Sequence, residues 1–275
     1  MTKPLIRYPG GKRRLATVIE NLLGQSNGTY YEPCVGAGGA FLGRKHRPRA
    51  AVLGDRNPRI IGLHTAVRDQ PAAVVQALAA LPSTGITREL YEQLRAEHND
   101  GEHAGPTFAA RMIWLSRAGF NGLHRENQQG RHNVPMGDRT HITLPTPEQV
   151  HAVSGALDGV ELVRCDFAAL LGEARPGDLY YLDPPYLGGF TAYTAGQFGR
   201  EEHDTLAQFA RLAARKGARV LASGYAGGET AAAYAGSRVV WRGAVGHSIS
   251  ADGSRREQRG EAMYLWGPER LGGVR

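Results

Sequence analysis

The sequence has few cysteines and no long hydrophobic run. Its two cysteines, Cys34 and Cys165, cannot form a disulfide framework or complete a four-cysteine zinc site. We therefore expect a reducing compartment and no metal. No stretch approaches the unbroken apolar length of a membrane span, and the start of the chain lacks a signal-peptide core. These absences predict a soluble, intracellular (cytoplasmic) protein that does not bind a membrane.

The charge balance is basic, with a formal net charge of +7 and a sequence pI of about 9.6. This excess of positive charge is compatible with an anionic partner, and clustered arginines can line a path for phosphates. From charge alone, solvated basic surfaces are the simpler interpretation. The clusters are Arg117, Arg125, Arg131 and Arg139 in the middle of the chain, and Arg255, Arg256 and Arg259 near its end.

Apolar patterns alternate between helical and strand-like segments. Helical spacing covers residues 12–23, 58–81, 87–119 and 201–216, and strand-like runs lie at 30–32, 50–55, 160–163, 178–182, 218–222 and 261–265. This alternation predicts a doubly wound α/β fold with a mostly parallel sheet, built from residues 1–57 and 158–275. Residues 58–157 form a mainly helical insertion. Its polar, glycine-rich part, about 119–139, predicts an exposed hairpin rather than core.

Asp183-Pro184-Pro185-Tyr186 directly follows the apolar run that ends at Leu182. Two prolines cannot continue a paired strand, so the backbone leaves the sheet there in a rigid extended shape. A carboxylate, a fixed carbonyl and an aromatic ring then project together. The first two are acceptors that can localise the lone pair of an exocyclic amino group, and Tyr186 can stack on an extruded base. An ordinary strand-terminating turn explains the four residues about equally well.

Residues 31–42, YEPCVGAGGAFL, place three glycines immediately after a strand. Glycine lets a nucleotide-like ligand approach the backbone closely, and Asp55, at the end of the next strand, suits ribose hydroxyls. The loop departs from GxGxxG at Phe41, which disfavours NAD, and Pro9–Lys12 is not a Walker A loop. We interpret Cys34 as a packing residue beside the ligand.

Together these segments resemble the Dam family of DNA adenine methyltransferases, the D12 class, in family order from about Ile6 to Leu265. The matching segments are RYPGGK (7–12), YEPCVGAGGAFL (31–42), LGDRNPRII (53–61), GFNGLHR (119–125), HNVPMG (132–137), CDF (165–167), YYLDPPY (180–186) and HSISADGSRR (247–256). The sequence departs from the family at Ser116, where Asn is usual, at Gly224, where Asn is frequent, and at His247, where Arg is usual.

The resemblance implies a Rossmann-like methyltransferase fold with S-adenosylmethionine as cofactor. The cofactor-binding positions would be Tyr8, Lys12, Glu32, Pro33, Gly36, Gly38, Asp55, Asp166, Phe167 and Asp183. Without it, Tyr8 would be interpreted as a core ring and Lys12 as a surface charge. The catalytic set would be Asp183, Pro184, Pro185 and Tyr186, with no metal.

The resemblance also implies double-stranded DNA as partner, a nucleoid-associated location and a monomer, with GATC as the site. The DNA-binding positions would be Arg7, Arg117, Phe120, Asn121, Leu123, Arg125, Asn133, Pro135, Ser248, Ser250, Arg255 and Arg256. Arg125 is expected to read a guanine; gripping a phosphate or pairing with Glu126 are the alternatives.

The predicted reaction is direct methyl transfer to adenine N6, either by a solitary enzyme or by one paired with a restriction endonuclease. Two alternatives remain at this stage. One is methylation of cytosine N4 or of RNA, which Asp183 disfavours because cytosine-N4 enzymes often carry Ser there. The other is a DNA-binding protein that kept the fold and lost turnover.

Overall fold

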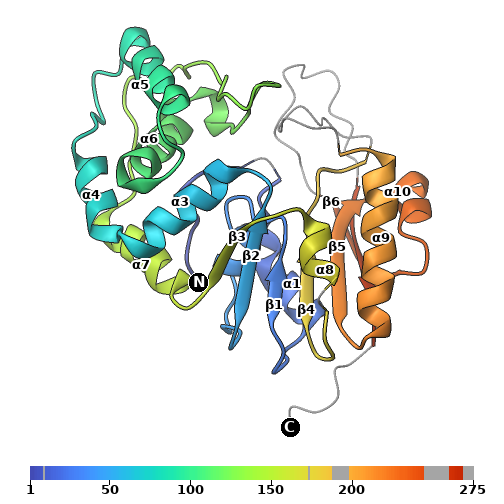
Figure 1. Ribbon diagram of the computed structural model, residues 1–275. Coiled ribbons are helices and arrows are strands. Elements are labelled where there is room, and N and C mark those ends of the chain that lie inside the picture. Colours follow the sequence, from blue (N-terminus) through green and yellow to red (C-terminus); the bar gives the residue numbers. More distant parts are fainter. Residues whose placement is uncertain (9, 173, 188–197, 245–259, 269–275) are drawn as a thin grey trace.

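A computed structural model describes residues 1–8, 10–172, 174–187, 198–244 and 260–268. Within these ranges the chain forms one seven-stranded sheet in the order β3-β2-β1-β4-β5-β7-β6 (Figure 1). β3, β2, β1, β4 and β5 are mutually parallel, and β7 runs antiparallel to β5 and β6. The strands are β1 (Tyr30–Glu32), β2 (Ala51–Asp55), β3 (Glu161–Arg164), β4 (Leu179–Leu182), β5 (Arg219–Tyr225), β6 (Arg238–Ala244) and β7 (Gly260–Trp266).

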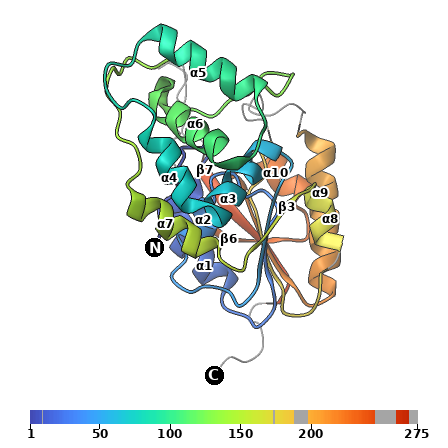
Figure 2. The same cartoon turned by 60° about the vertical axis from the view of Figure 1, so that its left-hand side comes forward.

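Helices cover both faces of the sheet, because alternate residues of each central strand point to opposite faces. On β4, Tyr181 packs in the cluster that holds Ile19 of α1, whereas Tyr180 packs with Leu206 of α9. Figure 2 shows α8 and α9 across the strands from α1. A short 3-10 helix (Lys12–Leu15) precedes α1 (Ala16–Leu23); the others are α2 (Gly39–Leu42), α8 (Phe167–Gly172), α9 (Arg200–Arg215) and α10 (Gly228–Ala233). The predicted doubly wound α/β fold is confirmed.

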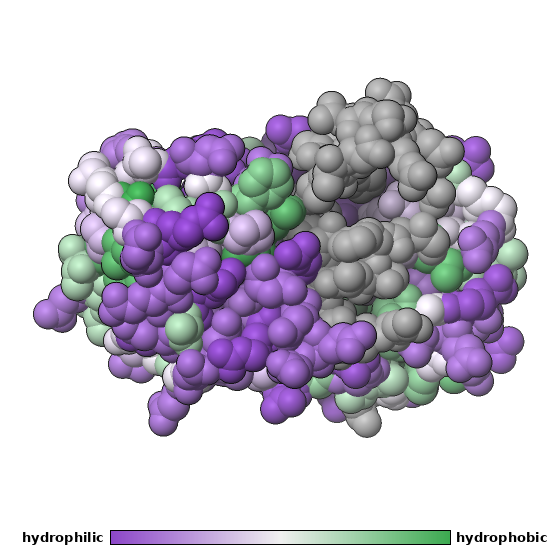
Figure 3. Space-filling model, turned by 90° about the horizontal axis from the view of Figure 1, so that it is seen from above, coloured by the Kyte–Doolittle hydropathy of each residue, from purple (hydrophilic) through white to green (hydrophobic). Residues whose placement is uncertain are grey.

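The helices between β2 and β3 share the main core of the sheet. Val67, Ile113 and Val153 belong to the same buried cluster as the residues of β1 and β2. A smaller cluster around Trp114 and Tyr91 joins the outer pair of helices. Seen from the carboxyl edge of the sheet, the surface over these helices is mostly hydrophilic (Figure 3). They are α3 (Pro58–Asp69), α4 (Pro71–Ala79), α5 (Arg88–Asp100), α6 (Gly105–Ala118) and α7 (Pro147–Leu157), with a 3-10 turn at Phe120–Gly122.

The polar stretch after α6 differs from its prediction as an exposed hairpin. Phe120 and Pro135 are exposed, but His124, Glu126, His132 and Val134 are buried. Composition does not reveal their surroundings: Glu126 bonds to Asn57, His124 stacks on Tyr8, and His132 meets His98 edge-on. The strand β6 was also not predicted. It is an edge strand on which Val239 is 41% exposed, so its apolar residues do not alternate clearly with polar ones.

Every helix in the described ranges is too short or too polar to span a bilayer.

Candidate active site

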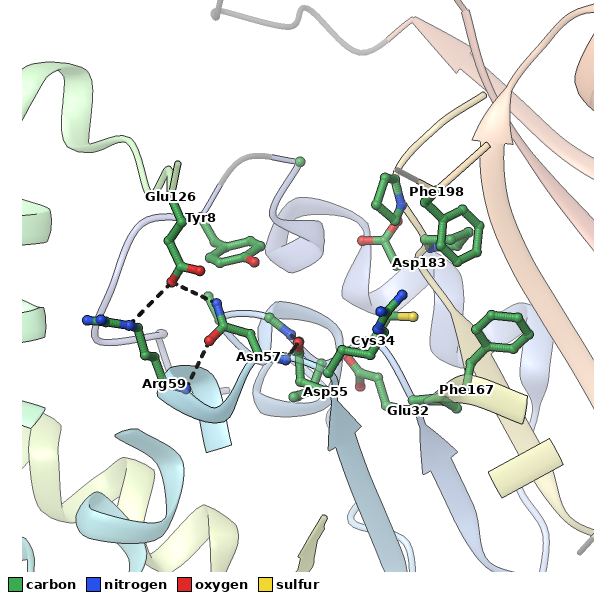
Figure 4. Close-up of a pocket in the computed structure, with 18 of the residues that line it drawn as sticks. Tyr8, Glu32, Cys34, Asp55, Asn57, Arg59, Glu126, Phe167, Asp183 and Phe198 are labelled. Carbon is green, nitrogen blue, oxygen red and sulfur yellow. Dashed lines mark hydrogen bonds and ion pairs between the residues drawn. The ribbon is translucent and has the colours of Figure 1, made fainter. Parts of the chain in front are cut away.

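A cavity of about 1200 Å³ opens where the carboxyl ends of the parallel strands meet the helices inserted between β2 and β3. The crevice beyond these strand ends is where open α/β sheets bind ligands. Figure 4 shows side chains from β1, β2, β4 and the loops after them pointing into it. Its walls include these predicted residues: Tyr8, Lys12, Glu32, Pro33, Gly36, Asp55, Asp166, Phe167, Asp183, Pro184, Pro185 and Tyr186.

The loop after β1 is turned by glycines. Gly36 has a φ of 47°, and a Cβ there would lie 3.1 Å from the Tyr8 ring, so the ring packs directly on the backbone. Gly38, with a φ of 74°, directly precedes α2, and a Cβ there would lie 3.3 Å from the Leu42 side chain. Gly39 lines the cavity, and the ligand contact expected of Gly38 stays a prediction.

Two acidic side chains stand at neighbouring strand ends. Glu32 is 2% exposed, and its Oε2 accepts a hydrogen bond from the Tyr30 hydroxyl at 2.7 Å. Burial raises the pKa of Glu32 to about 8. Asp55 accepts hydrogen bonds from the backbone N–H groups of Gly36 at 3.0 Å and Asn57 at 2.9 Å, while burial raises its pKa to about 6. Asp55 thus fixes the glycine loop as well as lining the cavity.

Lys12 and Asp183 form an ion pair at the inner end of the cavity. Nζ of Lys12 lies 2.9 Å from Oδ1 of Asp183, and the exposed side-chain fractions are 6% and 20%. Burial raises the pKa of Asp183 to about 6, and Lys12 opposes that rise. Lys12 is therefore no surface charge, and Asp183 is more enclosed than a strand end at the surface would be.

The residues after Asp183 are positioned by contacts with α9 and β5. The buried His203 of α9 donates from Nε2 to the Pro185 carbonyl at 3.0 Å, and its Nδ1 accepts from the Tyr234 hydroxyl at 2.8 Å. This tautomer follows because a carbonyl only accepts. The ring of Tyr186 meets Tyr225 edge-on, with centroids 5.0 Å apart. The Asp-Pro-Pro-Tyr segment is thus a fixed wall of the cavity.

Asp166 and Phe167 follow β3 and line the same cavity. Phe167 is 5% exposed and its ring centroid lies 5.6 Å from that of Phe198. The Asp166 carboxylate lies 3.7 Å from Nε of Arg56, and both side chains are largely exposed. Cys34 also lines the cavity, and burial raises the pKa of its thiol well above the ordinary value, which disfavours a nucleophilic thiolate.

A buried polar network ties the stretch after α6 to the cavity (Figure 4). Nδ2 of Asn57 donates to Oε1 of Glu126 at 2.9 Å, and Nε of Arg59 lies 3.9 Å from the same oxygen. The neighbouring His124 ring stacks on Tyr8 with centroids 5.2 Å apart. Sequence patterns missed Asn57, Arg59 and Glu126 as wall residues, although all three belong to or adjoin matching segments.

Some of the predicted DNA-contacting residues are exposed, and others are hydrogen-bonded within the protein. Phe120 is 40% exposed, and Asn121 next to it has a φ of 53°, unusual for a residue other than glycine. Arg125 donates to Oδ1 and the carbonyl of Asn133 at 2.8 and 3.1 Å, so the alternative pairing of Arg125 with Glu126 is wrong.

The other predicted contacts have mixed surroundings. Arg117 donates to the Leu5 carbonyl at 3.0 Å and holds the start of the chain on α6. The Ser116 hydroxyl accepts from the backbone N–H of Arg7 at 2.9 Å. Leu123 is half-buried and Pro135 exposed. Ser248, Ser250, Arg255 and Arg256 lie outside the described residues.

A glycine-turned loop and an acceptor-bearing Asp-Pro-Pro-Tyr segment thus meet at one edge of the sheet, the arrangement expected above for the class of enzymes that methylate exocyclic amino groups. The chain belongs to one family of this class, the D12 class N6 adenine-specific DNA methyltransferases, which its residues 8–241 match. The predicted Dam-type family is confirmed, and the protein is an adenine-specific DNA methyltransferase.

Named relatives agree with this assignment. The chain is 30% identical over 275 residues to the DNA adenine methylase of Escherichia coli K12, covering 97% of this chain and 96% of the relative. It is 29% identical over 231 residues to the Type II methyltransferase M1.LlaDCHI of Lactococcus lactis, covering 80% of each. Among solved structures, TrmN from Thermus thermophilus aligns with 93% of this chain and 48% of its own, at 11% identity and a TM-score of 0.41, too remote to add to the argument.

Proposed function

We propose that the chain transfers a methyl group from S-adenosylmethionine to N6 of an adenine flipped out of double-stranded DNA. The observation that carries this proposal is the single cavity of about 1200 Å³ shared by the glycine loop and the Asp-Pro-Pro-Tyr segment. Pockets for one small ligand usually measure about 300–1,000 Å³. The larger space suits a cofactor and a base side by side.

The cavity residues fit this cofactor chemically. Glu32 and Asp183 have raised pKa values, about 8 and about 6, because burial leaves their anions poorly solvated. A cationic ligand stabilises such anions, and S-adenosylmethionine carries an ammonium and a sulfonium. Asp55 suits the ribose hydroxyls, and the half-open wall at Asp166 and Phe167 suits the adenine. When bound, the cofactor supplies an electrophilic methyl group.

The chain's own contribution is to position the acceptor. The Asp183 carboxylate and the Pro184 carbonyl accept hydrogen bonds from the two N6–H groups and so direct the nitrogen lone pair toward the methyl group. Tyr186 stacks on the base, with Pro185 anchored by His203. The surplus proton passes to solvent after transfer. Orientation of two reactants in one complex provides most of the acceleration.

The proposed DNA surface consists of the hairpin at about 119–139 with Arg7, Arg117 and the predicted residues near 250. Its exposed Phe120 can fill the gap left by the flipped base. GATC is the proposed site, supported by the resemblance of this hairpin to Dam proteins. The division into a catalytic unit (1–57 and 158–275) and a recognition insertion (58–157), acting as a monomer, belongs to the same proposal. Among the described residues, no group of three or more histidine, cysteine or acidic side chains is arranged to hold a metal ion.

The test incubates the purified protein with S-adenosylmethionine labelled on its methyl group and with duplex DNA or RNA, then digests the product to nucleosides. Label in N6-methyl-2′-deoxyadenosine from DNA alone supports the proposal. Label in N4-methyl-2′-deoxycytidine or in RNA nucleosides would redirect the substrate assignment, and no label in any nucleoside would indicate a protein that binds DNA without turnover. Duplexes with and without GATC then test the site.

A further inference from the structure

Glu261 is a buried carboxylate next to Asp183 that no sequence pattern singled out. It lies near the start of β7, the reversed strand, and its side chain is 1% exposed. Its Oε1 lies 3.4 Å from Nζ of Lys12 and accepts a hydrogen bond from the Tyr186 hydroxyl. Since Nζ also lies 2.9 Å from Asp183, one ammonium is shared by two carboxylates.

The shared ammonium is itself firmly placed. Nζ of Lys12 donates to the Gly10 carbonyl at 2.6 Å and lies 5.0 Å from the centroid of the Tyr186 ring. Lys12, Asp183, Tyr186 and Glu261 thus form one contiguous group drawn from the 3-10 helix, the end of β4 and β7. A displacement of Glu261 removes one contact from the Tyr186 hydroxyl and one from the Lys12 ammonium.

We propose that Glu261 is a positioning residue for methyl transfer, which fixes the Tyr186 ring through its hydroxyl and holds the Lys12 ammonium against Asp183. This inference rests on the roles proposed above for Asp183 and Tyr186. Glu261 itself need not touch the cofactor or the base, because it acts through residues that do.

The charges around Asp183 make this role testable through pH. Burial is the largest cause of the raised pKa of Asp183; the charge of Lys12 opposes this rise, and the like charge of Glu261 adds to it. Loss of the Lys12 charge therefore raises the pKa of Asp183, and loss of the Glu261 charge lowers it. The other titratable or polar groups near Asp183 are Tyr8 before the 3-10 helix, Glu32 on β1, Cys34 after it, Tyr181 on β4, Tyr186, Ser223 on β5 and Tyr234 after α10.

The decisive experiment compares pH profiles of kcat/KM on duplex DNA for the intact protein, Glu261→Gln and Lys12→Gln. The acid limb reports ionisation in the free enzyme, and a midpoint near 6 is expected for Asp183. Glu261→Gln keeps an acceptor for Tyr186 but removes the charge, so its limb moves to lower pH by about one unit. Lys12→Gln moves the limb to higher pH. If the Glu261 carboxylate only stabilised the packing of β7, the two variants would not shift the acid limb in opposite directions.

Glu20→Gln is the matched control, because Glu20 is also a buried glutamate, 5% exposed, that bonds to the backbone of Lys45 and His46 away from the cavity. Its acid limb stays at the position of the intact protein. The inference is overturned if the acid limb of Glu261→Gln has the same midpoint pH as that of Glu20→Gln, or a higher one.

A second measurement does not depend on Glu261→Gln folding. Tyr186→Phe removes the hydroxyl but keeps the stacking ring, and kcat should fall about tenfold while the KM for cofactor stays within about twofold. An unchanged kcat in Tyr186→Phe also overturns the inference. If the intact protein makes N6-methyladenine and these variants behave like it, the role of Glu261 alone fails. If the intact protein makes none, the proposed function fails and the role of Glu261 with it.

Discussion

Glu32 illustrates at the scale of one residue how the cavity controls a charge. Burial raises its pKa from 4.5 to about 8, even though the Tyr30 hydroxyl bonds to it and the charge of Arg44 opposes the rise. Between these two pH values the folded protein holds a proton that the unfolded chain has lost. The free energy of unfolding contributed by Glu32 therefore decreases as pH rises from 4.5 to about 8, and it is fully present only below that window.

We predict that the melting temperature of the ligand-free protein decreases across this window more steeply than that of Glu32→Gln, which cannot lose a proton. Added S-adenosylmethionine should reduce the difference, because its positive charge stabilises the carboxylate. Thermal unfolding monitored by circular dichroism between pH 5 and pH 8 measures both effects, with Glu20→Gln as a second buried glutamate control. Parallel curves for the intact protein and Glu32→Gln would contradict the assigned ionisation.

At the scale of elements, the stretch after α6 is both surface and wall. Phe120 is exposed and Arg125 is hydrogen-bonded to Asn133, whereas Glu126 lines the cavity. The link through Asn57 connects the helical insertion to the loop that follows β2. We therefore expect changes in this stretch to affect both the proposed DNA surface and the cavity.

For Glu126→Ala we expect a loss of several kcal/mol in the free energy of unfolding, because truncation of one partner in a buried charged network costs about 3–5 kcal/mol. Arg59, 3% exposed, is then left without the nearby carboxylate, and burial already lowers its pKa. Glu126→Gln keeps an acceptor for Asn57 and should cost less. Urea unfolding of both variants measures the costs; equal stability of Glu126→Ala and the intact protein would show that the network contributes little.

For Arg125→Ala we expect relaxed preference at one base pair rather than uniformly slower methylation. A bidentate arginine–guanine contact provides about 1–3 kcal/mol of discrimination, and Asn133 holds the guanidinium at 2.8 Å in the free protein. Methylation rates across single-substituted duplexes report the preference, with the exposed Arg139→Ala as control. If every duplex slows by the same factor, Arg125 grips a phosphate instead.

The sequence predicted the strand ends well and the distant partners poorly. Asp55 and Asp183 follow apolar runs, so local pattern places them at the carboxyl edge of the sheet. The pairing of Lys12 with Glu261 joins opposite ends of the chain, and that of Asn57 with Glu126 crosses the insertion. Such contacts depend on the strand order, in which β7 inserts between β5 and β6, and no local pattern encodes that order.

At the scale of the whole molecule, the net charge of +7 predicts DNA binding that weakens steeply with salt. The double variant Arg255→Ala and Arg256→Ala should reduce the slope of log affinity against log salt by about two, because each phosphate contact contributes about 0.9. Sequence preference should not change. Fluorescence anisotropy titrations at several salt concentrations measure the slope, and an unchanged slope would mean that neither arginine contacts a phosphate.

We infer that Asp183, directly after β4, directs methyl transfer onto adenine N6. Single-turnover methylation of a duplex with one target adenine, by the intact protein and by Asp183→Ala, tests it most directly. We expect N6-methyladenine from the intact protein and a rate at least about a hundredfold lower in Asp183→Ala, which stays folded. A folded Asp183→Ala that methylates the same adenine at nearly the intact rate would contradict the claim.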